Sequence, residues 1–132
     1  MERWRDGEME RNYFNSKDLR IVKLAEEICD DIWELVDKWA WAAKKTVGVQ
    51  LINAADSIGA NICEGQGRHH RNDNIRFLYI SRGSLEETLY WLRRSVKRKL
   101  LSQEDYKNNM EKLENLRPQL NAFIKSKFRR DG

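Results

Sequence analysis

Apolar positions recur at helical spacing in four separate segments of the chain. The first stripe predicts a helix over about residues 17–38, and Asn15 or Ser16 can cap its start. Its apolar positions are Ile21, Ala25, Ile28, Ile32, Leu35 and Trp39. Neither glycine nor proline occurs over residues 39–45, so we expect a very short turn between this helix and the next.

The second and third helices differ in the width of their apolar faces. The second carries Val47, Leu51, Ala54, Ile58 and Ile62, and Gly65 is its predicted end, because Gly65 and Gly67 can adopt left-handed conformations. The third begins near residues 72–73 and carries two stripes. These are Ile75, Leu78, Leu85, Leu89, Leu92 and Val96, and then Phe77, Ile80, Ser84 and Trp91. A lone four-helix monomer seldom needs so wide an apolar arc, which favours contact between subunits.

The fourth helix has a clear start and an interruption. Ser102 caps it, with Asp105 completing an imperfect capping box, and its stripe contains Tyr106, Met110, Leu113, Leu116, Leu120 and Phe123. Pro118 lies inside this pattern, removes a backbone donor and clashes with the preceding turn. We therefore expect a kink there, or a break into two shorter helices.

Four helices with short connections predict an all-α protein, an antiparallel up-down-up-down four-helix bundle. The length of 132 residues suits one domain. We assign the bundle to residues 14–128, with an N-terminal extension over residues 1–13, ordered or disordered, and a basic C-terminal tail over residues 129–132.

Composition and charge narrow the class of protein. The net charge is +4, a moderate basic bias that permits contact with nucleic acid. The start of the chain lacks a signal-peptide core, and no apolar run approaches the roughly 20 residues of a membrane span. Two cysteines are too few for a disulfide framework. We expect a cytoplasmic protein that does not contact a membrane.

The predicted topology sorts the basic residues to both ends of the bundle. One end receives the turn Arg68, His69, His70 and Arg71 together with Lys125, Lys127, Arg129 and Arg130. The other receives Arg93, Arg94, Lys97, Arg98 and Lys99, beside Lys44 and Lys45. The first helix is acidic through Glu26, Glu27, Asp30, Asp31, Glu34 and Asp37. Such asymmetry suits packing between copies or contact with a charged polymer.

No residue set forms a convincing catalytic constellation, and we expect neither an enzyme, a metal nor a cofactor. A nuclease using Glu64, His69 and His70 is the weakest alternative, because adjacent histidines point in different directions and no ligand set accompanies them. Asn61 and Glu64 are better explained as local structural contacts.

The basic and aromatic residues leave alternatives open. The basic turn either binds phosphates or is solvated. Residues 93–99 either bind phosphates or favour the helix end and pair with a neighbouring subunit's acidic helix. Trp33, Trp39, Trp41 and Trp91 could stack on bases, although packing in the core or between subunits is the stronger interpretation. At least one of Trp39 and Trp41 is a candidate for an interface.

A central motif carries a family resemblance. It comprises Ser57-Ile58-x-Ala60-Asn61-Ile62-x-Glu64-Gly65-x-Gly67-Arg68, then Ile75-Arg76-Phe77-Leu78-Tyr79-Ile80 and Gly83-Ser84-Leu85. With Lys17-Asp18-Leu19 and Leu24-Ala25, it resembles the four-helix-bundle proteins encoded in intervening sequences of bacterial 23S ribosomal RNA genes, over about residues 14–127. Gly59 and Asn74 depart from the family pattern, which commonly has proline and an aromatic residue there.

The resemblance implies a ring-shaped homopentamer and an association with nucleic acid. A related branch, the accessory variability determinants of diversity-generating retroelements, binds a reverse transcriptase and nucleic acid. We therefore expect a non-enzymatic oligomeric protein that binds RNA or DNA, with RNA favoured, and a retroelement accessory scaffold as the alternative. The candidate nucleic-acid contacts lie in the basic turn, at the end of the third helix and in the C-terminal segment. They are Arg68, His69, His70, Arg71, Arg76, Arg93, Arg94, Lys97, Arg98, Lys99, Lys125, Lys127, Arg129 and Arg130.

Overall fold

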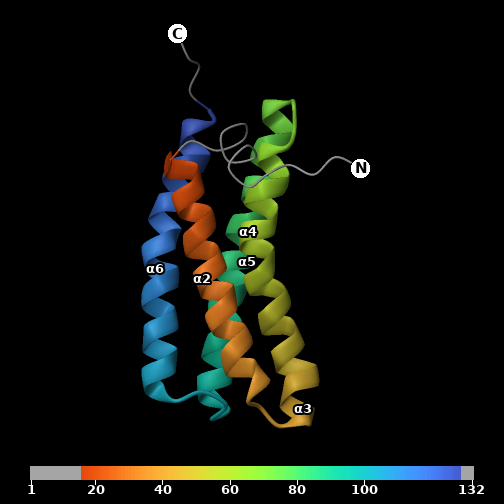
Figure 1. The fold of residues 1–132 in the computed structure, drawn as a ribbon, viewed down its shortest axis with the longest axis vertical. Helices are drawn as coiled ribbons and strands as arrows, with labels where there is room; N and C mark the ends of the chain where they lie inside the picture. The colour runs from red at the N-terminus through yellow and green to blue at the C-terminus, as the bar shows by residue number, and fades with distance from the viewer. Residues whose placement is uncertain (1–15, 129–132) are drawn as a thin grey trace.

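Four long helices form the described part of the chain (Figure 1). The computed structural model describes residues 16–128. The long helices are α2 (Ser16–Asp37), α4 (Val49–Gln66), α5 (Arg71–Lys97) and α6 (Gln103–Ser126). A short helix α3 (Trp41–Ala43) and a π-helical turn (Lys44–Gly48) lead into α4. The described residues include no strand, which confirms the all-α prediction.

The helices alternate in direction, as the up-down-up-down prediction requires (Figure 1). Helix α2 packs beside α4 and α6, and α5 packs beside the same two helices. The predicted extension over residues 1–13 and the tail over residues 129–132 lie outside the described residues, as does the cap candidate Asn15.

The predicted apolar stripes form the buried core with small shifts of register. On α2, Val36 is fully buried, whereas Leu35 is only partly buried against the core, as is Trp39 just beyond the end of the helix. The first stripe of α5 is buried as far as Leu92, whereas Val96 is half-buried. Its second stripe is much less enclosed: Ile80 is exposed, and Phe77 and Trp91 are half-buried. The single chain therefore leaves part of the apolar arc on α5 uncovered.

The connection between α2 and α4 is short, as predicted, but carries extra helical turns. The chain leaves α2 at Asp37 and becomes helical again at Trp41. Gly48 is buried at the end of the π-helical turn, where a Cβ would lie 2.7 Å from Cγ1 of Val36. Only glycine therefore lets this segment pack so closely on α2.

The prediction that Gly65 and Gly67 end their helix in left-handed conformations is wrong. Helix α4 continues to Gln66, and no glycine over residues 16–128 has a positive φ. Gly65 serves packing instead, because a Cβ there would lie 3.1 Å from the backbone oxygen of Asn74 and 3.2 Å from Cβ of Phe77. Asn74 completes the junction by donating from Nδ2 to the backbone oxygen of Gly65 at 2.7 Å.

Helix α6 begins as predicted but is not broken by its proline. The backbone N–H of Asp105 donates to Oγ of Ser102 at 3.0 Å, which confirms the cap. Pro118 lies within one continuous helix and is exposed. Leu116 and Leu120, on either side of it, are fully buried, so core packing keeps the helix continuous at the loss of one backbone hydrogen bond.

Polar contacts between helices complete the bundle. Oγ of the buried Ser81 on α5 donates to the backbone oxygen of Ile58 on α4 at 2.7 Å. Arg117 on α6 forms a two-pronged ion pair with Glu86 on α5, at 2.8 and 2.9 Å. Within residues 16–128, no helix is long and apolar enough to cross a lipid bilayer.

Candidate nucleic-acid interface

Basic residues gather at both ends of the bundle, as the topology predicts. The turn between α4 and α5 lies at the same end of the molecule as the C-terminus of α6, which carries Lys125 and Lys127 (Figure 1). The C-terminus of α5 lies at the opposite end, with the start of α4. Arg129 and Arg130 lie outside the described residues.

The turn end carries positive charge that a nearby carboxylate partly compensates. Nη2 of Arg68 lies 2.5 Å from Oε1 of Glu64, and its guanidinium lies 4.7 Å from the centre of the Phe77 ring. Arg76 lies over the same ring, at 5.1 Å. His69, His70 and Arg71 are exposed.

The weak nuclease alternative gains no support from this turn. The carboxylate of Glu64 is paired with Arg68, and Asn61 donates to the backbone oxygen of Ser57 at 2.8 Å. No group of three or more potential metal ligands occurs in the described part of the chain. Both polar residues make the local contacts expected near a helix end.

At the other end, Lys44 pairs with Asp37, whereas the basic residues at the end of α5 are uncompensated. We call Arg93, Arg94, Lys97, Arg98 and Lys99 the α5 cluster. None of their side chains makes an ion pair with any carboxylate of residues 16–128, and all are exposed except the half-buried Arg94. The helix dipole favours cations here. The dipole does not remove the repulsion between the positive charges of the α5 cluster.

The backbone at this end presents the cluster in an unusual way. Lys99 has a φ of 63°, the position that glycine usually fills after a helix. The N–H of Leu100 donates to the oxygen of Ser95 at 2.8 Å, and the N–H of Lys99 donates to that of Val96 at 3.1 Å. These two bonds close a Schellman motif with a lysine at its left-handed position.

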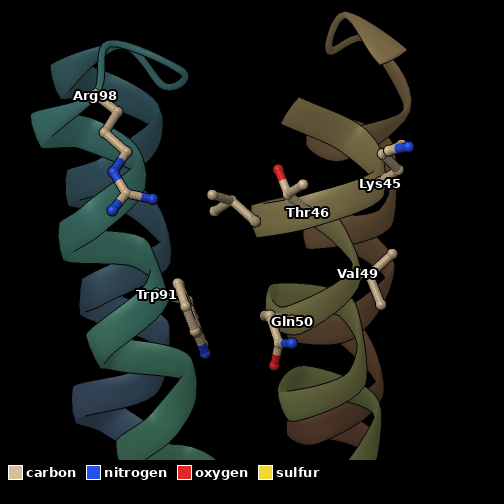
Figure 2. Close-up of a pocket in the computed structure, with 7 residues that line it drawn as sticks. Lys45, Thr46, Val49, Gln50, Trp91 and Arg98 are labelled. Carbon is tan, nitrogen blue, oxygen red and sulfur yellow. The ribbon is translucent and has the colours of Figure 1, made fainter. Parts of the chain in front are cut away.

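An open cavity of about 370 Å³ lies beside the α5 cluster, between the start of α4 and the end of α5 (Figure 2). We call it the α4/α5 cavity. Its lining residues are Lys45, Thr46, Val47, Val49, Gln50, Trp91 and Arg98. The sequence analysis placed Lys45 and Arg98 together but missed Thr46 and Gln50. The four-residue spacing of these two is compatible with one helical face, but no sequence signal shows which way that face points.

The four tryptophans within residues 16–128 occupy different environments. Trp39 packs against the core, whereas Trp41 is 71% exposed and lies under Nζ of Lys45 at 3.9 Å. Trp33 is 57% exposed on α2. Trp91 is half-buried, and its indole N–H donates to Oε2 of Glu87 at 3.3 Å. Of the pair Trp39 and Trp41, Trp41 is therefore the candidate for an interface.

The acidic face of α2 is only partly neutralised. Lys112 on α6 pairs with Asp31 and, at 3.1 Å, with Glu27. Lys44 lies 3.5 Å from Asp37. Exposed acidic side chains without an ion pair among the described residues remain at Glu26, Asp30 and Glu34.

A second cavity, of about 280 Å³, lies between α2 and α4 and contains both cysteines among its lining residues. Both are free thiols. Burial, followed by the charges of Asp56 and Asp30, raises the pKa of Cys29 to about 11. Burial and then Glu26 raise the pKa of Cys63 as well. Thiols shifted in this direction are poor nucleophiles at neutral pH.

Comparison with known proteins places the fold. The chain is similar to the crystal structure of a protein of unknown function from the S23 ribosomal protein family of Bacteroides thetaiotaomicron. The two are 26% identical with a TM-score of 0.77, and the match covers 83% of this chain and 98% of the other. No curated protein matches the sequence. The model of the family described as 23S rRNA-intervening sequence protein matches residues 17–122, most of the bundle, and the chain therefore belongs to that family.

Proposed function

We propose that this protein is a non-enzymatic, oligomeric RNA-binding protein that contacts phosphates mainly through the α5 cluster. The observation that carries the proposal is the absence of any carboxylate partner for this cluster within residues 16–128. Adjacent like charges repel each other, and a polyanion relieves that repulsion while releasing its own counterions. The family description, which refers to 23S rRNA, favours RNA over DNA.

The turn end is a secondary contact in this proposal. Arg68 already has a carboxylate partner in Glu64, so a phosphate that binds there competes with an existing ion pair. His69, His70 and Arg71 are exposed and add contacts when an RNA extends to that end.

Assembly through α5 is the second part of the proposal. Tyr79, Ile80, Gly83 and Tyr90, which we call the α5 outer face, project within one arc of the helix. Tyr79, Ile80 and Tyr90 are 42–48% exposed, and no atom lies within 4 Å of a Cβ built on Gly83. A glycine inside an exposed helix costs about 1 kcal/mol relative to alanine. Its use is explained if the backbone of another subunit packs there, as in the ring-shaped homopentamer that the family resemblance implies.

A salt-titrated RNA-binding assay tests the phosphate contacts. Replacing Arg93, Arg94 and Lys97 together with glutamine should weaken binding to a single-stranded RNA and make the salt dependence shallower by roughly 0.7 per lost contact. The matched control replaces Arg68, Arg71 and Arg76 with glutamine and should have the smaller effect. If the wild-type protein does not bind RNA even at low salt, the proposal is wrong.

A protein partner is the second candidate function, favoured by the acidic face of α2. Trp33 is 57% exposed and lies between Asp30 and Glu34, an aromatic anchor with an acidic surround. A reverse transcriptase with a basic surface, as in the retroelement alternative, would fit it. Calorimetric titration of a purified reverse transcriptase should then show binding that Trp33→Ala weakens. Unchanged binding by this variant would exclude the α2 face.

A further inference from the structure

The α4/α5 cavity has the size and composition of a small-ligand site. Its volume of about 370 Å³ falls within the range of about 300–1,000 Å³ that is usual for such sites. It combines an aromatic ring, a guanidinium and an amide, which come from Trp91, Arg98 and Gln50 on two different helices. These are the groups that recognise the base and the phosphate of an unpaired nucleotide.

On the α5 side of the cavity, the ring of Trp91 and the charge of Arg98 follow one another along the helix axis. Trp91 and Arg98 are seven residues apart, two helical turns, or roughly 10 Å along the helix axis. The Arg98 side chain extends along α5 toward Trp91 (Figure 2). No carboxylate of the described chain pairs with it. Trp91 is held by its bond to Glu87 and by edge-to-face contact with Tyr90, whose ring centre lies 5.0 Å away. The ring is thus positioned before a ligand arrives.

The α4 wall supplies hydrogen-bonding groups. The hydroxyl of Thr46 donates to the backbone oxygen of Ala42 at 2.7 Å, which leaves its oxygen able to accept. The Gln50 side chain is exposed and makes no hydrogen bond with the rest of residues 16–128, so its amide can donate and accept. Lys45 points away from Arg98 and lies over Trp41, so it forms only the rim (Figure 2).

We infer that the α4/α5 cavity binds one unpaired nucleotide of an RNA strand, with the base against Trp91, the base edge toward Gln50 and a phosphate on Arg98. This inference rests on the proposed function and adds to it a preference for single strands. A stacked, paired base does not expose a face to an aromatic side chain, whereas an unpaired base does. The α5 cluster alone would bind duplex and single strand through charge.

Mononucleotide titration tests the cavity directly. Adenosine 5′-monophosphate should shift the indole N–H resonance of Trp91 in NMR spectra, and adenosine should bind more weakly because it lacks the phosphate. Arg98→Gln should lower the affinity for the monophosphate to that for adenosine. Trp91→Leu should weaken binding of both by roughly 5-fold to 150-fold, the range expected for one stacked base. If the wild-type protein binds the nucleotide and the nucleoside with equal affinity, the Arg98 contact with the phosphate is excluded.

Binding to longer RNA separates this inference from the proposed function. Trp91→Leu should weaken binding to a single-stranded RNA but not to a duplex with the same number of phosphates. Trp33→Leu is the matched control and should change neither affinity. Trp91→Phe keeps an aromatic face and should give an intermediate loss for the single strand. Thermal melts followed by circular dichroism establish that each variant is folded.

Each outcome decides one point. If wild-type protein binds no RNA at low salt, the proposed function fails. If it binds RNA with a steep salt dependence that Trp91→Leu does not change for the single strand, the RNA function stands and the nucleotide site is wrong. If Trp91→Leu lowers the mass of the assembly without changing nucleotide binding, the cavity is a contact between subunits, and the inference is again wrong.

Discussion

Lys99 combines an unfavourable backbone conformation with a favourable charge. Its φ of 63° places it at the left-handed position of the Schellman motif. A residue with a Cβ pays roughly 1–2 kcal/mol for this conformation, whereas a cation at a helix C-terminus gains about 0.3–1 kcal/mol. The strain is therefore the larger effect.

Lys99→Gly should stabilise the folded protein by about 0.5–1 kcal/mol, because it removes the strain and loses only the smaller dipole interaction. Chemical denaturation followed by circular dichroism measures the change. Lys99→Ala is the control: it loses the charge, keeps the strain and should destabilise. If the glycine variant is less stable than the alanine variant, backbone strain at residue 99 is not the larger effect.

Cys29 should react slowly with alkylating reagents. Burial is the largest cause that raises its pKa to about 11, and the charge of Asp56 is the next. At pH 8.5 the folded protein should therefore hold Cys29 almost entirely as the thiol. Asp56→Asn should lower the pKa of Cys29 and speed its reaction with iodoacetamide, measured by mass spectrometry in a Cys63→Ser background. An unchanged rate would show that Asp56 does not control the reactivity of the thiol.

The same raised pKa fixes the direction of a pH effect. Unfolded protein loses the Cys29 proton near the ordinary cysteine pKa of about 8.5, whereas folded protein keeps it until about pH 11. Between these values the folded state binds more protons, so the contribution of Cys29 to stability falls as the pH rises. Below about pH 8.5 both states hold the Cys29 proton, so Cys29 causes no further change of stability with pH.

At the scale of single elements, glycines in α4 and α5 have opposite roles. Gly65 packs against the backbone of Asn74, where a Cβ would be too close at 3.1 Å. Gly83 faces open space in the subunit. Gly65→Ala should destabilise the bundle by about 1–3 kcal/mol through overpacking, whereas Gly83→Ala should stabilise the subunit by up to about 1 kcal/mol. Urea unfolding of both variants at low protein concentration measures the two effects. A stabilising Gly65→Ala would contradict the close packing of α4 on α5.

Most of each helix could be predicted from the sequence because burial imposes a strong period. The stripe of α4 from Val47 to Ile62 is buried as predicted, and the cap at Ser102 follows from local hydrogen bonding. The conformations of Gly65 and Lys99 could not be predicted, because residue type alone decides neither. Glycine was needed for contact with α5, and a lysine took the left-handed position. Pro118 illustrates the same limit, since buried leucines on both sides preserve the helix.

The candidate site was predictable in its charge and not in its shape. The alternation of helix directions is enough to bring Lys45 and Arg98 to the same end of the bundle. Ion pairing is a property of side-chain geometry, so the sequence could not distinguish the compensated Arg68 from the uncompensated α5 cluster. The wall formed by Thr46 and Gln50 depends on the rotation of α4, which the π-helical turn before it helps to set.

At the scale of the whole molecule, the proposed assembly and the proposed RNA binding reinforce each other. An assembly built through the α5 outer face repeats the α5 cluster once in each subunit. An RNA long enough to reach several subunits then binds with avidity, which can exceed the affinity for one subunit by about 10²–10⁴. A short oligonucleotide that contacts one subunit gains nothing from assembly.

Gly83→Trp should separate these two contributions. The bulky side chain blocks close approach at the α5 outer face and leaves the charge of the chain unchanged, so light scattering should show a lower mass than for wild type. Affinity for a short oligonucleotide should be unchanged, whereas affinity for a long RNA should fall by about 10²-fold or more. Asn108→Trp, at an exposed position on α6, is the control and should alter neither mass nor affinity. If Gly83→Trp lowers the mass while long RNA binds as before, one subunit carries the whole RNA site. If the mass does not change, subunits meet through another face and Gly83 needs a different explanation.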